Sequence, residues 1–127
     1  MTRQTHWILV FGFILVIAFA SFAPAETLPP SERQKIEALI EAVGSLKEAR
    51  FVRNGSAYSA DSAAYFLRRK WQANESNVKT ALDFIKNVAS FSGTSGKPYL
   101  IRFNDGKELT SRDFLLGVLA RLDQSRG

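Results

Sequence analysis

The sequence predicts an α+β fold, with about four helices packed on a small antiparallel sheet made from two short hairpins. Four segments place apolar residues at the i, i+3, i+4, i+7 spacing of one helix face. Two short runs rich in aromatic and β-branched residues are each followed by an Asn/Gly turn signal. The order strand, turn, Ser or Thr cap and helix occurs at 51–72 and again at 102–122. This recurrence suggests that two similar units meet in one sheet, with the helices on one face.

The first helix is predicted over residues 31–46. Ser31 and Gln34 have the S-x-x-Q spacing of a capping box, in which side chains satisfy the free N–H groups of the first turn. The expected buried face consists of Ile36, Leu39, Ile40, Val43 and Leu46.

The first hairpin is predicted to pair residues 50–53 with 56–58. Asn54-Gly55 lies between them, and this pair tolerates the positive φ angles of a type I′ turn. Ser59 is then expected to cap a second helix that ends near residues 72–74. The apolar stripe of that helix consists of Ala60, Ala64, Leu67 and Trp71.

The second half of the chain repeats this order after one more helix. That third helix is predicted to begin at Asn77 or Thr80, and its expected buried face is Ala81, Leu82, Ile85, Val88 and Ala89. A loop of small residues, 90–96, leads to a strand over 99–103, and 107–109 can return as its partner after the 104–106 turn. Thr110 is expected to cap the last helix, which carries Phe114, Leu115, Val118, Leu119 and Leu122.

Residues 1–25 have the pattern of a cleavable secretory signal peptide. One cation precedes an apolar run that begins at Trp7, and Ala23 and Ala25 occupy the positions that a signal peptidase reads. The run reaches about 24 Å as a helix, which is shorter than the roughly 30 Å hydrocarbon core of a bilayer. We therefore expect an exported single domain over residues 26–127, which contacts the membrane only through the signal peptide before cleavage. An uncleaved anchor is the alternative.

The composition excludes several chemistries from that domain. The chain has no cysteine, and its one histidine, His6, lies in the predicted signal peptide. Zinc, copper or iron sites built on imidazole or thiolate are therefore not expected, nor are Ser-His-Asp or Cys-His nucleophiles. No cofactor and no catalytic residue is predicted. The net charge of +5 favours anionic partners and solubility, whereas nucleic-acid binding calls for denser charge interleaved with aromatic residues.

Candidate binding residues fall in two turn-and-strand blocks and one basic run. Such positions often display binding groups. The alternative is that these residues are structural. Gly55 can adopt a positive φ angle, Pro98 can rigidify the loop, and Tyr58 and Tyr99 can pack in the core. The basic run on the second helix forms either a solvated face or an anion-binding face joined by Arg53 or Lys97. The candidates are Arg53, Asn54, Gly55, Tyr58, Arg68, Lys70, Ser95, Gly96, Lys97 and Tyr99.

Two further patterns in the sequence give weaker indications of function. The Gly93–Lys97 loop does not have the spacing of a nucleotide-binding P-loop, but its N–H groups beside Lys97 can form an anion nest. Carboxylates near predicted turns and helix starts leave acid–base catalysis open, although such residues ordinarily complement a helix dipole. These carboxylates are Asp61, Asp83, Asp105, Glu108 and Asp113.

Five blocks of the sequence are specific when taken together: 51–58, 63–64, 67–70, 80–85 and 95–101. They resemble the YfeK-like family of small bacterial periplasmic proteins, a domain of unknown function. The resemblance spans about residues 31–122 and implies a signal peptide and a periplasmic location, with no known activity. Family members tend to carry Glu-His where this chain has Tyr65-Phe66.

These observations predict a non-catalytic binding module for an envelope protein or an anionic envelope component. The alternative is a small carboxylate-dependent hydrolase or lyase that acts on envelope carbohydrate.

Overall fold

The computed structural model describes residues 28–126, and it confirms the predicted α+β fold. The predicted signal peptide, 1–25, lies outside these residues. No helix in the 28–126 range is long and apolar enough to cross a membrane. The helices are α2 (Pro30–Gly44), α3 (Ala60–Ala73), α4 (Ala81–Asn87) and α5 (Ser111–Arg126), with a short 3₁₀ turn at Glu75–Asn77. The strands are β1 (Arg50–Arg53), β2 (Ser56–Tyr58), β3 (Leu100–Arg102) and β4 (Glu108–Thr110).

The two predicted hairpins join in one antiparallel sheet with the strand order β2-β1-β3-β4. The central pairing is between β1 and β3, where Phe51 lies opposite Ile101. Asn54 and Gly55 both have positive φ angles, 51° and 82°, as the type I′ turn requires. The two related units therefore meet through their first strands, as the recurrence in the sequence suggested.

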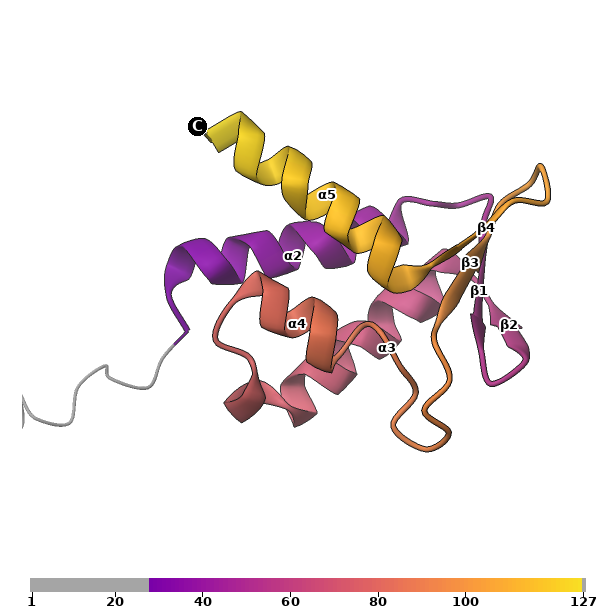
Figure 1. The fold of residues 1–127 in the computed structure, drawn as a ribbon, viewed down its shortest axis with the longest axis horizontal. Helices are drawn as coiled ribbons and strands as arrows, with labels where there is room; N and C mark the ends of the chain where they lie inside the picture. The colour runs from indigo at the N-terminus through magenta and orange to yellow at the C-terminus, as the bar shows by residue number, and fades with distance from the viewer. Residues whose placement is uncertain (1–27, 127) are drawn as a thin grey trace, which may run out of the picture.

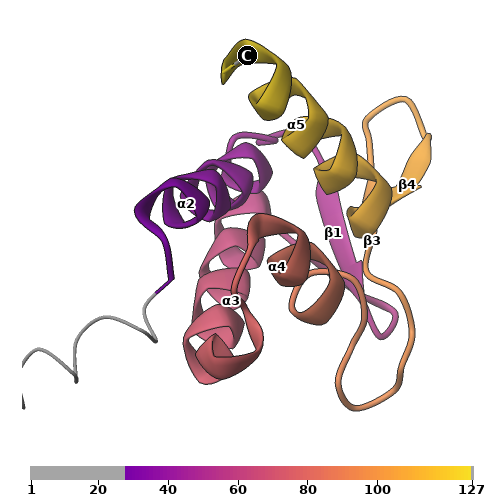
Figure 2. The same cartoon turned by 60° about the vertical axis from the view of Figure 1, so that its left-hand side comes forward.

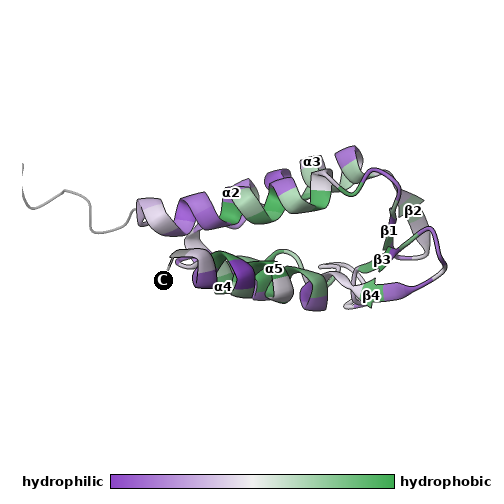
Figure 3. Cartoon of the chain, turned by 90° about the horizontal axis from the view of Figure 1, so that it is seen from above, coloured by the Kyte–Doolittle hydropathy of each residue, from purple (hydrophilic) through white to green (hydrophobic). Residues whose placement is uncertain are grey.

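The helices form two layers, and the sheet lies across one end of them. Figure 3 shows α2 and α3 in one layer and α4 and α5 in the other, with the strands beyond their ends. Figures 1 and 2 show the same arrangement from two further directions. α2 packs against the other three helices, so the core lies between the layers. Its fully buried side chains include Ile36, Leu39, Val43, Phe84, Ile85, Val88, Ile101 and Leu115.

Three predicted helix caps are present in the structure. Ser59 Oγ accepts a hydrogen bond from the Ser62 N–H at 3.2 Å. Thr80 Oγ1 accepts from the Asp83 N–H at 3.0 Å, which identifies Thr80 rather than Asn77 as the cap of α4. Thr110 Oγ1 accepts from Asp113 N–H at 3.0 Å. Each hydroxyl satisfies an N–H group that the first turn cannot pair within the helix.

The predicted capping box of the first helix is wrong. α2 begins at Pro30, so Ser31 lies inside its first turn rather than at the cap. Proline suits this position because its missing N–H is not needed there. Glu32 instead accepts a hydrogen bond from the Ala81 N–H at 2.7 Å, and so supports the start of α4.

One predicted core residue of α4 is also wrong. Leu82 is 46% exposed, whereas Phe84 is fully buried. Ala81, Phe84 and Ile85 define the buried face by their i, i+3, i+4 spacing, and Leu82 is rotated about 100° away from Ala81.

Candidate functional site

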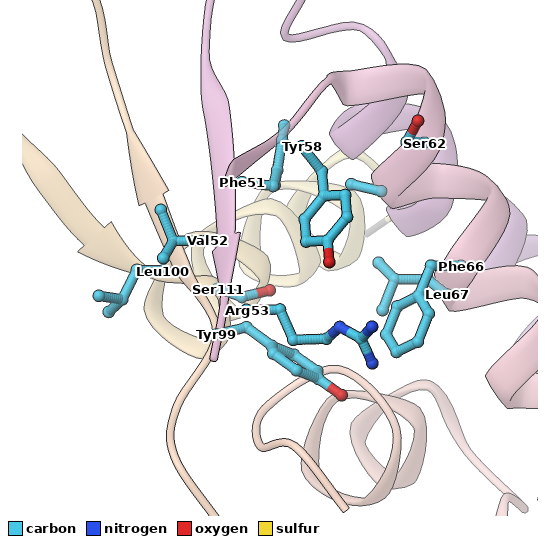
Figure 4. Close-up of a pocket in the computed structure, with 11 residues that line it drawn as sticks. Phe51, Val52, Arg53, Tyr58, Ser62, Phe66, Leu67, Tyr99, Leu100 and Ser111 are labelled. Atoms are coloured by element: carbon cyan, nitrogen blue, oxygen red, sulfur yellow. The ribbon is translucent and has the colours of Figure 1, made fainter. Parts of the chain in front are cut away.

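A cavity of about 240 Å³ lies between the first hairpin and α3. Most of its wall is apolar or aromatic, and none of its lining residues carries a carboxylate. Figure 4 shows Arg53 reaching from β1 toward Phe66, with Tyr58 on one side and Tyr99 on the other. The cavity therefore combines aromatic walls with one cationic side chain.

Strand alternation explains how the hairpin supplies these groups. Phe51 and Arg53 are two residues apart in β1, so they point to the same face of the sheet. Tyr58 of β2 lies directly opposite Phe51 and points to that face too. α3 contributes Phe66 and covers the same region.

Arg53 is held by aromatic rings and not by an acid. Its guanidinium carbon lies 4.6 Å from the ring centroid of Phe66 and 5.7 Å from that of Tyr58. Within residues 28–126, no ion pair or side-chain hydrogen bond of Arg53 is formed. These cation–π contacts place none of the guanidinium N–H groups in a side-chain hydrogen bond with residues 28–126, so the groups remain available as donors.

Lys70 provides a second cation beside the cavity. Its Nζ donates to the Tyr99 hydroxyl and to the Phe91 carbonyl oxygen, both at 2.8 Å. Burial lowers the pKa of Lys70, and the nearby charge of Arg53 lowers it further. Burial also raises the pKa of Tyr99, whose ring meets Phe66 edge to face at 5.8 Å. The two cations therefore create a positive potential next to an aromatic wall.

Ser92 anchors the loop between α4 and β3 to the β1–β2 turn. It is 4% exposed, and its Oγ accepts from Asn54 Nδ2 at 3.2 Å. The Ser95 hydroxyl donates to Asn54 Oδ1 at 2.5 Å. Figure 2 shows this loop passing beside the turn. Asn54 and Ser95 therefore hold two segments together, and Ser92, which sequence reasoning missed, is the centre of the contact.

The same hydrogen bonds bear on the anion-nest hypothesis. The N–H groups of Thr94 and Ser95 point to Ser92 Oγ at 3.3 and 3.4 Å. Those of Gly96 and Lys97 donate to Ser92 O and Ser95 Oγ. These four amides, over residues 94–97, thus point to oxygen atoms of their own loop rather than to an anion.

Arg68 lies away from the cavity. Its guanidinium forms a two-pronged contact with the carboxylate of Glu37, at 2.9 and 2.7 Å. The hydrogen bonds from Arg68 lower the pKa of Glu37. Lys97 is exposed on its loop and lines no part of the cavity.

The structure thus brings together only part of the predicted binding set. Arg53, Tyr58 and Tyr99 line the cavity and Lys70 lies beside it, bonded to Tyr99, whereas Asn54 and Ser95 join in the loop contact. Gly55 and Gly96 serve positive φ angles of 82° and 74°. Sequence reasoning missed Phe66, which is partly buried, as a wall residue; neighbouring Tyr65 is 62% exposed.

The predicted acidic residues do not gather at one place. Asp61 pairs with Lys47 at 2.7 Å, and Glu108 pairs with Arg102 at 3.0 Å. Asp83 and Asp113 lie in the first turns of α4 and α5. Among residues 28–126, no group of three His, Cys, Asp or Glu side chains is placed to hold a metal ion.

Comparison with known proteins finds a matching family and a similar relative. Residues 30–123 match the family of unknown function DUF5329. A relative from Salmonella typhimurium, named "Uncharacterized protein YfeK", is 40% identical over 68 residues, which cover 54% of this chain and 57% of that protein. No solved structure matches the chain. Because the family match covers most of the chain, the protein belongs to DUF5329, and its YfeK-like character is confirmed.

Proposed function

We propose that this protein is an exported, non-catalytic module that binds an anionic component of the cell envelope at the Arg53 cavity. The observation that carries the proposal is the state of Arg53. Its guanidinium lies in cation–π contact with Phe66 and Tyr58, forms no ion pair with residues 28–126, and lines a cavity without a carboxylate. An arginine already held by aromatic side chains loses little freedom when it binds an anion.

The cavity favours a ligand with two adjacent parts. An anionic group can accept hydrogen bonds from the guanidinium edge, and Lys70 adds positive potential nearby. An apolar group can fill the space beside Phe51 and Phe66. The alternative of a carboxylate-dependent hydrolase or lyase finds no support at this site, because the lining residues include no Asp or Glu.

Titration with a small amphipathic anion tests this proposal. We would add 3-phenylpropionate, and separately its neutral amide, to the ¹⁵N-labelled protein and follow the amide resonances by NMR. The carboxylate should shift the resonances of Phe51, Tyr58 and Phe66. The Arg53→Met variant should bind it at least about tenfold more weakly, because hydrogen bonds to charged groups contribute about 1.5 kcal/mol or more.

Arg68→Met is the matched control, because Arg68 already pairs with Glu37 outside the cavity. It should bind like the unchanged protein. Equal binding by the Arg53→Met protein, or shifts confined to other surfaces, would contradict the proposal.

Export is tested separately by the intact mass of the protein recovered from its producing cells. A chain that begins at Glu26 supports the cleaved signal peptide and the periplasmic location. A chain that begins at Met1 supports the uncleaved anchor.

A further inference from the structure

β2 is an edge strand, and its three residues are all exposed. In a two-residue hairpin the residues that flank the turn exchange both main-chain hydrogen bonds, here Arg53 and Ser56. The hydrogen-bonded pairs alternate along the strands. The N–H and C=O of Ala57 therefore point away from β1, toward the open side of the sheet.

The opposite edge of the sheet is less suited to pairing. β4 carries Glu108, which forms an ion pair with Arg102 of β3 at 3.0 Å. Charged side chains on an edge strand discourage a further strand from adding to it. β2 consists of Ser, Ala and Tyr, so no charge protects it.

The free edge of β2 lies next to the cavity. Tyr58 follows Ala57 directly, and the ring of Tyr58 is 5.7 Å from the guanidinium carbon of Arg53. A strand added to β2 would lie about 4.8 Å from it, with alternate side chains on the face that carries Tyr58. Those side chains are then within reach of Arg53 and of the α3 side of the cavity, where Phe66 lies.

We propose that the ligand is an extended peptide segment that pairs with the main chain of Ala57, places a carboxylate on Arg53 and puts a neighbouring apolar side chain in the cavity. This inference rests on the proposed function and names the class of its ligand. Charge complementarity supports it, because Arg53 lines a cavity without acids, and Lys70 lies beside that cavity, where it bonds the hydroxyl of the lining residue Tyr99. The carboxylate comes from a Glu or Asp side chain or from a chain terminus, since both present the same group to the guanidinium.

The test uses short peptides and the amide of Ala57 as the reporter. The first peptide has about six residues of alternating threonine and valine, with a glutamate in place of one valine and an amidated end. A second has glutamine instead of glutamate, and a third has no glutamate but a free terminal carboxylate after valine. The first or the third should slow hydrogen exchange of the Ala57 amide, and which one does so identifies the source of the carboxylate. The glutamine peptide should bind about tenfold more weakly than the glutamate peptide if the side chain is that source.

A main-chain variant separates this inference from the proposed function. Ala57→Pro removes the outward N–H and leaves the pairing to β1 intact, a position where edge strands accept proline. Ala57→Val is the matched control, because it keeps the N–H. Peptide binding should be lost in the first and kept in the second, while both still bind 3-phenylpropionate.

A peptide methylated at the amide nitrogen that would pair with Ala57 repeats the test on the unchanged protein, and so does not depend on the folding of the proline variant. It should bind at least about tenfold more weakly than the unmethylated peptide. Binding of 3-phenylpropionate without any protection of the Ala57 amide by the peptides would overturn the peptide proposal and leave the anion site standing. That result would point to a lipid or carbohydrate anion instead. Failure of both ligands would overturn both proposals.

Discussion

Replacement of Ser92 by alanine should destabilise the protein by about 1–2 kcal/mol. Ser92 is almost completely buried, and its Oγ lies 3.2 Å from Asn54 Nδ2 and 3.0 Å from Thr94 Oγ1. A typical hydrogen bond contributes about 1 kcal/mol to stability. The backbone contacts from Thr94 and Ser95, at 3.3 and 3.4 Å, are long and belong to exposed residues that water can serve, so they add little.

Urea unfolding followed by circular dichroism measures this effect. Lys97→Ala is the control on the same loop, because that exposed side chain forms no hydrogen bond or ion pair with residues 28–126. We expect it to change the free energy of unfolding by less than about 0.5 kcal/mol. A Ser92→Ala protein as stable as the Lys97→Ala protein would refute the assignment of Ser92 as the anchor between loop and turn.

The remaining predictions concern the core and the buried lysine. Phe84→Ala should cost about 3–5 kcal/mol in unfolding free energy, because Phe84 is fully buried and its ring centroid lies 6.0 Å from that of Trp71. Leu82→Ala on the same helix should cost less than about 1 kcal/mol, and similar losses in the two variants would contradict the observed face of α4. Because burial lowers the pKa of Lys70 below 10.5 in the folded protein, the unfolding free energy should rise with pH in the window just below 10.5. Urea titrations at about pH 8 and about pH 10 measure this rise, which should be smaller in the Lys70→Met protein. An identical pH dependence of the unfolding free energy in both proteins would contradict the lowered pKa of Lys70.

Local signals predicted most of the elements because they act within a few residues. Ser59, Thr80 and Thr110 each bond an N–H three positions ahead. Asn54-Gly55 forms the turn that its φ preferences favour. In each case the structure depends on residues that lie within three positions of each other in the sequence.

The sequence-based predictions were wrong where the deciding contact comes from a residue distant in the sequence, or where the apolar pattern is short. Glu32 supports α4 through the Ala81 N–H, across 49 positions of sequence. Nothing near Ser31 reveals this contact, so the capping-box spacing there was misleading. α4 has seven residues, and so short a helix contains too few apolar positions to fix its orientation, which explains the wrong placement of Leu82.

The cavity could be predicted only in part for the same reason. Arg53 and Tyr58 belong to one local hairpin, so the turn-and-strand pattern was enough to predict both as binding candidates. Phe66 and Lys70 reach the site through the packing of α3 on the sheet, which no periodicity encodes. Arg68, two residues from Lys70, faces Glu37 instead, because successive helical residues point in different directions.

The structural and binding interpretations of the two turn-and-strand blocks are not exclusive. Asn54 follows Arg53 directly, and its amide group is held from both ends, by Ser92 and by Ser95. This contact fixes the residue next to Arg53 while Phe66 and Tyr58 hold its guanidinium. The loop that carries Ser92 and Ser95 also leads to Tyr99, which bonds Lys70. Ser92 and Ser95, which line no part of the cavity, therefore support the segments that carry Arg53 and Tyr99, and a change at Ser92 should weaken anion binding as well as stability.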